Sequence, residues 1–273
     1  MTIPAETHPN AALKSATPRF WIATPRSIIA LILREMSTSY GRSPGGYLWA
    51  VLEPTAGIAL LTIVFSMGFQ APALGTNFPL FYATGMLPFL AYMDVQAKLA
   101  TALMFSKALL SYPRVTYVDA LLARFCLNFF TQLLVSYLIF AAISLTWDTK
   151  TALDLPRIAT SLAMVGMLSF GVGTLNCFLS MRFQVWQRIW AILNRPLFLV
   201  SCIFFLFDAI PEPWRGVLWY NPLVHVVGMM RAGFYPYYDA SYVSVPYVMG
   251  LGLGLTALGL LLLDRHHRDL LQR

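Results

Sequence analysis

The amino-acid sequence predicts an all-α membrane protein with six transmembrane helices and with both termini in the cytoplasm. The prediction depends on an apolar composition, on segments of bilayer-spanning length and on a one-sided distribution of basic residues. Of the 273 residues, 58% are hydrophobic and 11% are charged, whereas soluble domains carry about 25% charged residues. The mean hydropathy is +0.64. Much of the protein surface is therefore expected to contact lipid rather than water.

Six segments approach the roughly 20 apolar residues that a helix needs to cross the hydrocarbon core. Helices are expected because lipid offers no partners to unpaired backbone groups. With their connections, the segments form a six-span domain over residues 47–264. Their approximate ranges are 48–69, 78–99, 120–145, 158–181, 190–207 and 245–263.

Basic residues determine the predicted orientation, because Lys and Arg concentrate in cytoplasmic loops. Of the 19 basic residues, five lie before the first span, four in and beside the loop after the second, three after the fourth and three at the C-terminus. Both termini are therefore predicted to be cytoplasmic, with 265–273 as a basic tail. The same distribution accounts for the net charge of +7, so a nucleic-acid partner is not expected.

The N-terminal part is predicted to lie outside the spans. Residues 1–21 are polar and contain no apolar run, which indicates a flexible cytoplasmic tail rather than a signal peptide. Residues 22–46 mix apolar positions with charges such as Glu35, a pattern typical of an amphipathic helix in the membrane interface. Glycine and proline residues from Gly41 to Gly46 then predict a turn into the first span. A passive flanking segment remains the alternative.

The cytoplasmic loop 105–119, between spans two and three, mixes aromatic and basic residues around Pro113. A short helix over about 106–111 would present an apolar face to a groove in a soluble partner. A solvated connector explains the same pattern.

The outer segment 208–242, between spans five and six, is rich in Trp, Tyr and Pro. Trp and Tyr prefer the membrane–water boundary. The apolar part of this segment is too short to cross, which predicts two re-entrant helices that meet near Asn221 and Pro222, where protein shields the backbone. An aromatic belt with no further role is the alternative.

The sequence contains no recognisable catalytic or metal-binding motif. It has no G-x-x-x-x-G-K-[ST] loop, no H-E-x-x-H and no G-x-S-x-G, and its three cysteines are scattered through apolar segments. Enzymatic activity, a metal site and a cofactor on this chain are therefore not expected. An ion-coupled sugar transporter would show internal repeats, and a membrane-bound lipid-modifying enzyme would show a polar cluster at one membrane face; neither pattern is evident. Gly250 and Gly254 form a G-x-x-x-G motif, which favours close helix contact in the last span.

Several runs of residues carry a family resemblance. They are Arg34-Glu35-Met36 with Gly41, the stretch GYLWAVLEP that contains Trp49, Glu53 and Pro54, the stretch GMLPF that begins at Gly85, and the stretch WYNPLVHVV that begins at Trp219. Together they resemble the ABC-2 type permeases of the capsular polysaccharide export family. The similarity extends over nearly the whole chain after about residue 25.

The resemblance implies a homodimer in the bacterial inner membrane that works with two copies of a separate ATP-binding subunit, which carries ATP and Mg. The substrate would be a lipid-linked polysaccharide, and periplasmic and outer-membrane capsule export proteins would continue the conduit. An O-antigen or teichoic-acid export permease of the same architecture is the alternative.

The resemblance also assigns roles to particular residues. Coupling to the ATPase would involve Arg34, Glu35, Lys107, Tyr112 and Arg114. A periplasmic exit gate would comprise Trp214, Trp219, Tyr220, Asn221, Pro222 and His225.

Overall fold

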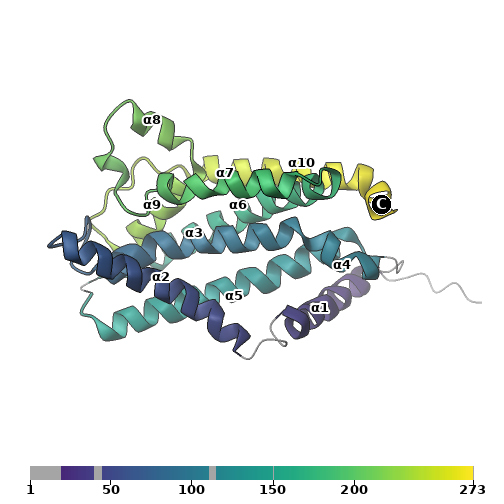
Figure 1. Cartoon of the computed structure of the whole chain (residues 1–273), viewed down its shortest axis with the longest axis horizontal. Helices are drawn as coiled ribbons and strands as arrows, with labels where there is room; N and C mark the ends of the chain where they lie inside the picture. The colour runs from purple at the N-terminus through teal and green to yellow at the C-terminus, as the bar shows by residue number, and fades with distance from the viewer. Residues whose placement is uncertain (1–19, 40–44, 111–114, 150, 273) are drawn as a thin grey trace, which may run out of the picture.

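The computed structural model describes residues 20–39, 45–110, 115–149 and 151–272. These residues form helices and no strand, which confirms the all-α prediction (Figure 1). In chain order, the helices are α1 Phe20–Ser39, α2 Gly46–Gly68, α3 Phe78–Ala100, α4 Ala102–Leu110, α5 Tyr117–Thr146, α6 Leu155–Arg182, α7 Trp186–Val200, the 3-10 helix Phe207–Ala209, α8 Trp214–Trp219, α9 Pro222–Phe234 and α10 Val245–Gln272.

Four helices in the described part of the chain are long and apolar enough to cross a membrane. They are Leu48–Gly68 within α2, the whole of α5 and α6, and Val245–His266 within α10. The second and fifth predicted segments correspond to α3 and α7, which do not meet that standard. Helix α7 has only 15 residues, and α3 carries Asp94 and Lys98 in its second half.

The fifth segment, expected to be helical over 190–207, ends seven residues early, at Val200. Cys202 adopts a left-handed backbone conformation with φ of 57°, which stops the helix. The carbonyls released by this break are bound by Arg231 from α9, which donates to the oxygens of Ile203 and Phe205 at 2.9 Å each. A side chain far along the sequence therefore stabilises the irregular stretch.

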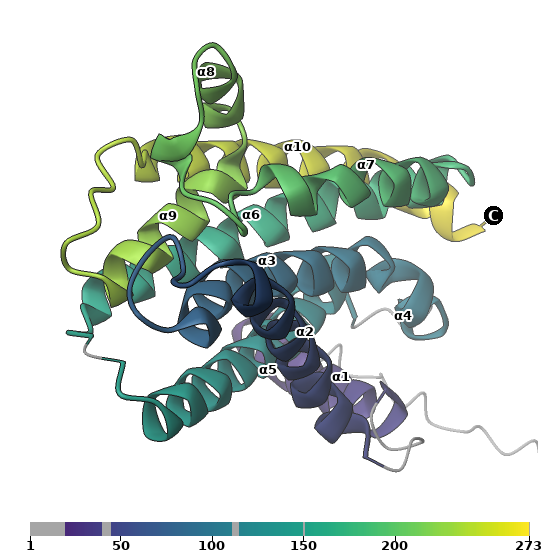
Figure 2. The same ribbon diagram turned by 60° about the vertical axis from the view of Figure 1, so that its left-hand side comes forward.

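Helix α6 lies at the centre of the fold, against α3, α9 and α10 (Figures 1 and 2). In its most apolar 18-residue window, 67% of the residues are buried, compared with 11% in α2 and 17% in α10. The two outer helices therefore leave most of their apolar surface to lipid or to another subunit. Helices α1, α4 and the end of α10 lie at one end of the molecule, and α8 lies at the other (Figure 1).

Helices α6 and α10 pack backbone against backbone through glycine. A Cβ added at Gly171 of α6 would collide with the carbonyl oxygen of Gly252, and a Cβ at Gly259 would lie 2.8 Å from the nitrogen of Leu175. Gly250 and Gly254, the motif glycines, have no other atom within 4 Å of an added Cβ. The close contact in α10 is thus made by different glycines, and the motif lies on the open face of the helix.

Replacing Gly252 with alanine is expected to destabilise the protein by about 1–3 kcal/mol, because the added methyl group overpacks a tight contact. Its Cβ would lie 2.9 Å from the carbonyl oxygen of Met167, on a backbone that cannot rotate away. Gly254→Ala, two residues along the same helix, is the control and should be neutral or stabilising by about 0.5–1 kcal/mol. Thermal unfolding in detergent would compare them, and equal stabilities would contradict the packing described here.

The first and last helices extend into segments that were predicted to be tails. Helix α1 begins at Phe20, inside the segment 1–21 that was expected to be a tail, and α10 continues to Gln272 through the predicted basic tail. Residues 1–19 and the turn residue Gly41 lie outside the described residues.

Candidate functional site

A buried ion pair joins α1 to α5 at the end of the molecule where α4 lies. Glu35 of α1 and Arg124 of α5 are 5% and 7% exposed, and Arg124 Nε lies 3.2 Å from Glu35 Oε1. Asn128, one turn further along α5, donates to the same carboxylate oxygen at 3.4 Å. Because a buried charge is tolerated only with such partners, these contacts fix α1 against α5.

Helix α4 joins the same junction through Phe105. The Phe105 ring makes cation–π contacts with two guanidinium groups, that of Arg124 at 4.5 Å and that of Arg34 at 5.4 Å from the ring centroid. Arg124 also donates to the carbonyl oxygen of Thr101, in the turn between α3 and α4, at 3.3 Å. We call the residues Arg34, Glu35, Phe105, Arg124 and Asn128 the α1–α4–α5 junction.

A capping box positions Arg124 for this role. At the start of α5, the Thr116 hydroxyl accepts from the Asp119 backbone nitrogen at 3.2 Å, and the Asp119 carboxylate accepts from the Thr116 nitrogen at 3.0 Å. Reciprocal bonds of this kind satisfy two of the free N–H groups at a helix start. These bonds define where α5 begins, and therefore the position of Arg124 along the helix.

Of the five residues assigned to coupling, the structure places Arg34 and Glu35 in the junction and Lys107 on the exposed side of α4. Tyr112 and Arg114 lie outside the described residues. The short helix expected over about 106–111 is present as α4, but begins earlier, at Ala102. Phe105, Arg124 and Asn128 were not predicted as site residues, although an arginine within an apolar span is itself a signal of a partner or a function.

A polar pocket of about 450 Å³ lies between α2 and α3. It contains Trp49, Glu53 and Pro54, which with Gly41 form the family signature expected at the entry to the first span. Its remaining lining residues are Gly46, Ala50, Leu90, Met93, Asp94, Ala97 and Gln132. Asp94 accepts a hydrogen bond from Gln132 at 3.1 Å. Carboxylates, an amide and an indole ring together offer hydrogen-bond acceptors, donors and an apolar face.

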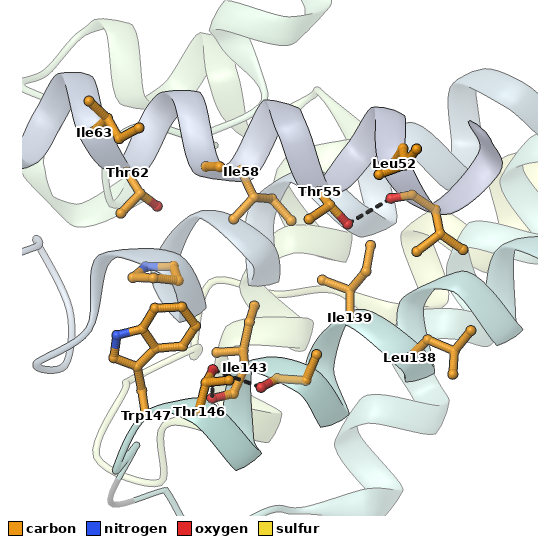
Figure 3. Close-up of a pocket in the computed structure, with 14 residues that line it drawn as sticks. Leu52, Thr55, Ile58, Thr62, Ile63, Leu138, Ile139, Ile143, Thr146 and Trp147 are labelled. Carbon is orange, nitrogen blue, oxygen red and sulfur yellow. Dashed lines mark hydrogen bonds between the residues drawn. The ribbon is translucent and has the colours of Figure 1, made fainter. Parts of the chain in front are cut away.

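A second cavity, a groove of about 560 Å³, lies on a different face of α2, against α5. Its lining is almost wholly aliphatic, with Trp147 at one end (Figure 3). The hydroxyls of Thr55 and Thr146 donate to carbonyls of their own helices. Among the lining residues that the structure describes, Thr62 has a buried hydroxyl without a hydrogen-bond partner. The groove therefore suits hydrocarbon and offers little to a polar ligand.

Aromatic side chains gather at the opposite end, where α8 meets α9. The Trp219 ring stacks on Tyr247 with centroids 5.3 Å apart and meets His225 edge-on at 5.1 Å. Trp219 Nε1 donates to the carbonyl oxygen of Tyr242 at 3.0 Å. We call Trp219, His225, Tyr242 and Tyr247 the outer aromatic cluster.

The two helices expected to meet near Asn221 and Pro222 are present: α8 ends at Trp219 and α9 begins at Pro222. Asn221 caps α9 by accepting from the Leu223 nitrogen at 3.0 Å, and donates to the Val200 carbonyl at the end of α7 at 3.1 Å. Trp219, Tyr220, Asn221, Pro222 and His225 therefore come together. Trp214 lies apart, exposed at the start of α8.

His225 is held in its neutral form. The Ser244 nitrogen donates to Nδ1 at 3.2 Å, which leaves Nε2 to carry the proton and to donate to the Trp219 carbonyl at 2.8 Å. Burial lowers the pKa of His225 below its ordinary value, against the opposing effect of its backbone hydrogen bonds. Protonation of Nδ1 would break the bond from Ser244.

Lowering the pH is therefore expected to destabilise this end of the protein. Since the folded state resists protonation of His225, the unfolded chain binds more protons below about pH 6.5, the pKa of an unfolded histidine, and stability falls from there down to the lowered pKa of the folded state. Unfolding in detergent between about pH 5 and 8 would measure it. A His225→Gln variant should lack this part of the pH dependence; an unchanged profile would contradict a neutral His225 in the fold.

Arg231 of α9 is 1% exposed. Besides its two carbonyl partners, it lies over the Phe81 ring at 4.4 Å from the centroid. It was not predicted as a site residue, because the sequence does not show that the chain after α7 folds back onto α9.

Comparison with known proteins identifies the family of the chain. A model of the ABC-2 type transporter family matches residues 26–235. The chain is 29% identical over 236 residues to the polysialic acid transport protein KpsM of Escherichia coli, covering 86% of this chain and 92% of that protein. It is 24% identical to the capsule polysaccharide export inner-membrane protein CtrC of Neisseria meningitidis serogroup A, covering 88% and 91%. It is 22% identical to the O-antigen export system permease protein RfbA of Klebsiella pneumoniae, covering 85% and 90%. Since the family match spans most of its length, the chain belongs to the ABC-2 type transporter family, as a non-catalytic membrane subunit.

Proposed function

We propose that this chain is the permease subunit of an ATP-driven ABC exporter that moves capsular polysaccharide across the bacterial inner membrane. The observation that carries the proposal is similarity along most of the chain to proteins named for polysaccharide transport, since KpsM and CtrC match over 86% and 88% of it. Similarity to the O-antigen permease RfbA is lower, at 22% identity. O-antigen export is therefore the second candidate.

The partners follow from what the sequence lacks and from the family. The sequence has no phosphate-binding loop, so ATP and Mg belong to a separate ATPase subunit, present in two copies beside two copies of this chain. The ATPases drive the cycle, while the permease supplies the path through the membrane.

The proposed topology has six spans, with α3 and α7 added to the four long apolar helices. Helix α3 is enclosed by α5, α6 and α9, so its polar side chains need not meet lipid. Helix α1 lies in the cytoplasmic interface, and α8 and α9 re-enter from the outer side. The grouping of α1, α4 and the end of α10 at one end (Figure 1) supports cytoplasmic termini.

The α1–α4–α5 junction is proposed to transmit motion from the ATPase. A partner that contacts α1 and α4, near Arg34 and Lys107, would act on two elements that Arg124 ties to α5. Because the ion pair is buried, α1 and α5 are expected to move together. Tyr112 and Arg114 belong to the same proposed contact.

The outer aromatic cluster is proposed to form the exit gate, opposite the junction. Aromatic faces offer apolar surface to sugar rings, and the carboxylates of the polar pocket accept hydrogen bonds from hydroxyl groups. A lipid-linked polysaccharide would pass from the cytoplasmic side to this gate, and then to periplasmic and outer-membrane partners.

Deletion of the gene, with complementation by the intact chain, tests the substrate. Surface polysaccharide should disappear in the deletion strain and return on complementation, and the chain should co-purify with an ATPase that has a phosphate-binding loop. A normal capsule in the deletion strain would exclude the capsular assignment. Loss of O-antigen instead would favour the second candidate.

A further inference from the structure

Two arginines on α7 lie on the face that turns away from the rest of the subunit. The opposite face is anchored: Trp186 Nε1 donates to Asn176 at 2.8 Å and Trp190 Nε1 donates to Gln96 at 2.9 Å. Arg188 and Arg195 are seven residues apart, which puts them on one side of a helix. Both are exposed, and within the described part of the chain neither forms an ion pair.

The position of Arg195 makes its exposure unusual. Helix α7 begins four residues after α6 ends at Arg182, on the cytoplasmic side of the proposed topology. With the start of α7 placed at the cytoplasmic boundary of the hydrocarbon core, as in the proposed topology, Arg195 lies roughly 13 Å deep at 1.5 Å per residue, within a core of about 30 Å. An arginine that faced lipid there would cost about 2.5–3.5 kcal/mol on insertion scales. The arginine face of α7 is therefore expected to meet water or a second subunit.

We propose that Arg188 and Arg195 line a water-filled conduit between two copies of this chain, and that they bind the carboxylate groups of an acidic polysaccharide. The inference rests on the proposed function and specifies the charge of its substrate. Planar guanidinium groups pair with carboxylates through two parallel hydrogen bonds, and two copies would present four of them.

The two carboxylates of the polar pocket do not neutralise this face. Glu53 and Asp94 line the polar pocket, whose lining comes from α2, α3 and α5 and includes no residue of α7. The conduit would thus keep a cationic wall, which attracts an acidic chain and repels cations.

The first test is whether Arg195 faces water. In a variant with Cys126, Cys177 and Cys202 replaced by alanine, Arg195→Cys is expected to react with a membrane-impermeant anionic thiosulfonate reagent, in the nucleotide-free or the ATP-bound complex. Leu253→Cys is the matched control, since Leu253 is 57% exposed within the apolar span α10, and it should react at least tenfold more slowly. Equal rates in both states would overturn the water-filled conduit.

The second test concerns charge. ATPase stimulation of the purified complex in nanodiscs would be measured with polysialic acid oligomers as the acidic probe and dextran oligomers as the neutral one. The Arg188→Gln/Arg195→Gln variant should need at least tenfold more polysialic acid for half-maximal stimulation. The Arg188→Lys/Arg195→Lys variant should need less than threefold more, and dextran should not stimulate.

Three results would overturn the proposal: no change in the Gln variant, equal stimulation by dextran, or a response that follows the phosphatidylglycerol content of the nanodiscs instead of the arginines. The last result would assign the arginine face to lipid headgroups. A complex that exports capsule normally with both arginines replaced would refute this inference alone. A deletion strain with a normal capsule would refute the proposed function on which it rests.

Discussion

Replacing Arg124 with alanine is expected to destabilise the protein by about 3–5 kcal/mol, because it leaves the Glu35 carboxylate buried without its cation. It also removes the cation–π contact with Phe105, so α1 and α4 lose their common partner on α5. Export of surface polysaccharide should be abolished. Thermal unfolding in detergent and a capsule assay of the complemented deletion strain would measure the two effects.

Arg157→Ala is the matched control for the ion pair. Arg157 pairs with Asp154 at 3.1 Å, but the two side chains are 47% and 39% exposed. Exposed pairs contribute about 0–1 kcal/mol, so this variant should unfold near the wild-type temperature. A loss of stability equal to that of Arg124→Ala would show that burial does not determine how much the ion pair contributes to stability.

A double replacement separates stability from transmission. Apolar side chains of similar volume often replace a buried ion pair without loss of stability, so Glu35→Leu/Arg124→Met should recover most of the unfolding temperature. If the pair transmits motion, ATP-driven export should stay impaired in this stable variant. Full recovery of export would reduce the pair to a structural role.

Replacing Arg231 with methionine is the second change with a large expected effect. The carbonyl of Ile203 would lose its donor at a buried site and that of Phe205 at a partly buried one, and each unsatisfied group costs about 1–3 kcal/mol. A loss of about 2–6 kcal/mol follows, together with release of the stretch between α7 and α8. Unfolding temperature and proteolysis in this stretch would report the change.

Arg215→Met provides the comparison, since Arg215 also donates to two carbonyls, those of Ile210 and Asp208, at 3.0 Å each. Its side chain is 38% exposed, so water can replace it and the loss should stay below about 1 kcal/mol. Similar losses in the two variants would contradict the buried position of Arg231.

The predicted helices were found where the hydrophobic signal is long and uninterrupted, as in α2, α5, α6 and α10. The end of α7 could not be found in this way. Residues 201–207 are as apolar as the helix before them, and the break depends on Arg231, which lies far along the chain. Hydropathy reports which residues avoid water, but it does not report where a backbone turns.

The candidate site was predicted in parts. Glu35 was expected in the amphipathic helix and Arg124 lies in the third predicted span, residues 120–145, but they are 89 residues apart and nothing local indicates that they pair. The α8–α9 meeting point was predicted because the apolar part of residues 208–242 is too short to cross a membrane. In the structure, Asn221 is the N-cap and Pro222 the first residue of α9, both residue types typical of a helix start. Tyr247 could not be assigned to the outer aromatic cluster from the sequence, because only the fold brings it beside Trp219.

In the six-span topology proposed above, the early end of α7 has a consequence for the surrounding bilayer. Fifteen residues span roughly 22 Å, about 8 Å less than the hydrocarbon core of an average membrane. Hydrophobic mismatch of this kind thins the local bilayer or draws headgroups toward the helix end. Exporter activity should therefore depend on acyl-chain length, and should be higher in short-chain than in long-chain phosphatidylcholine nanodiscs.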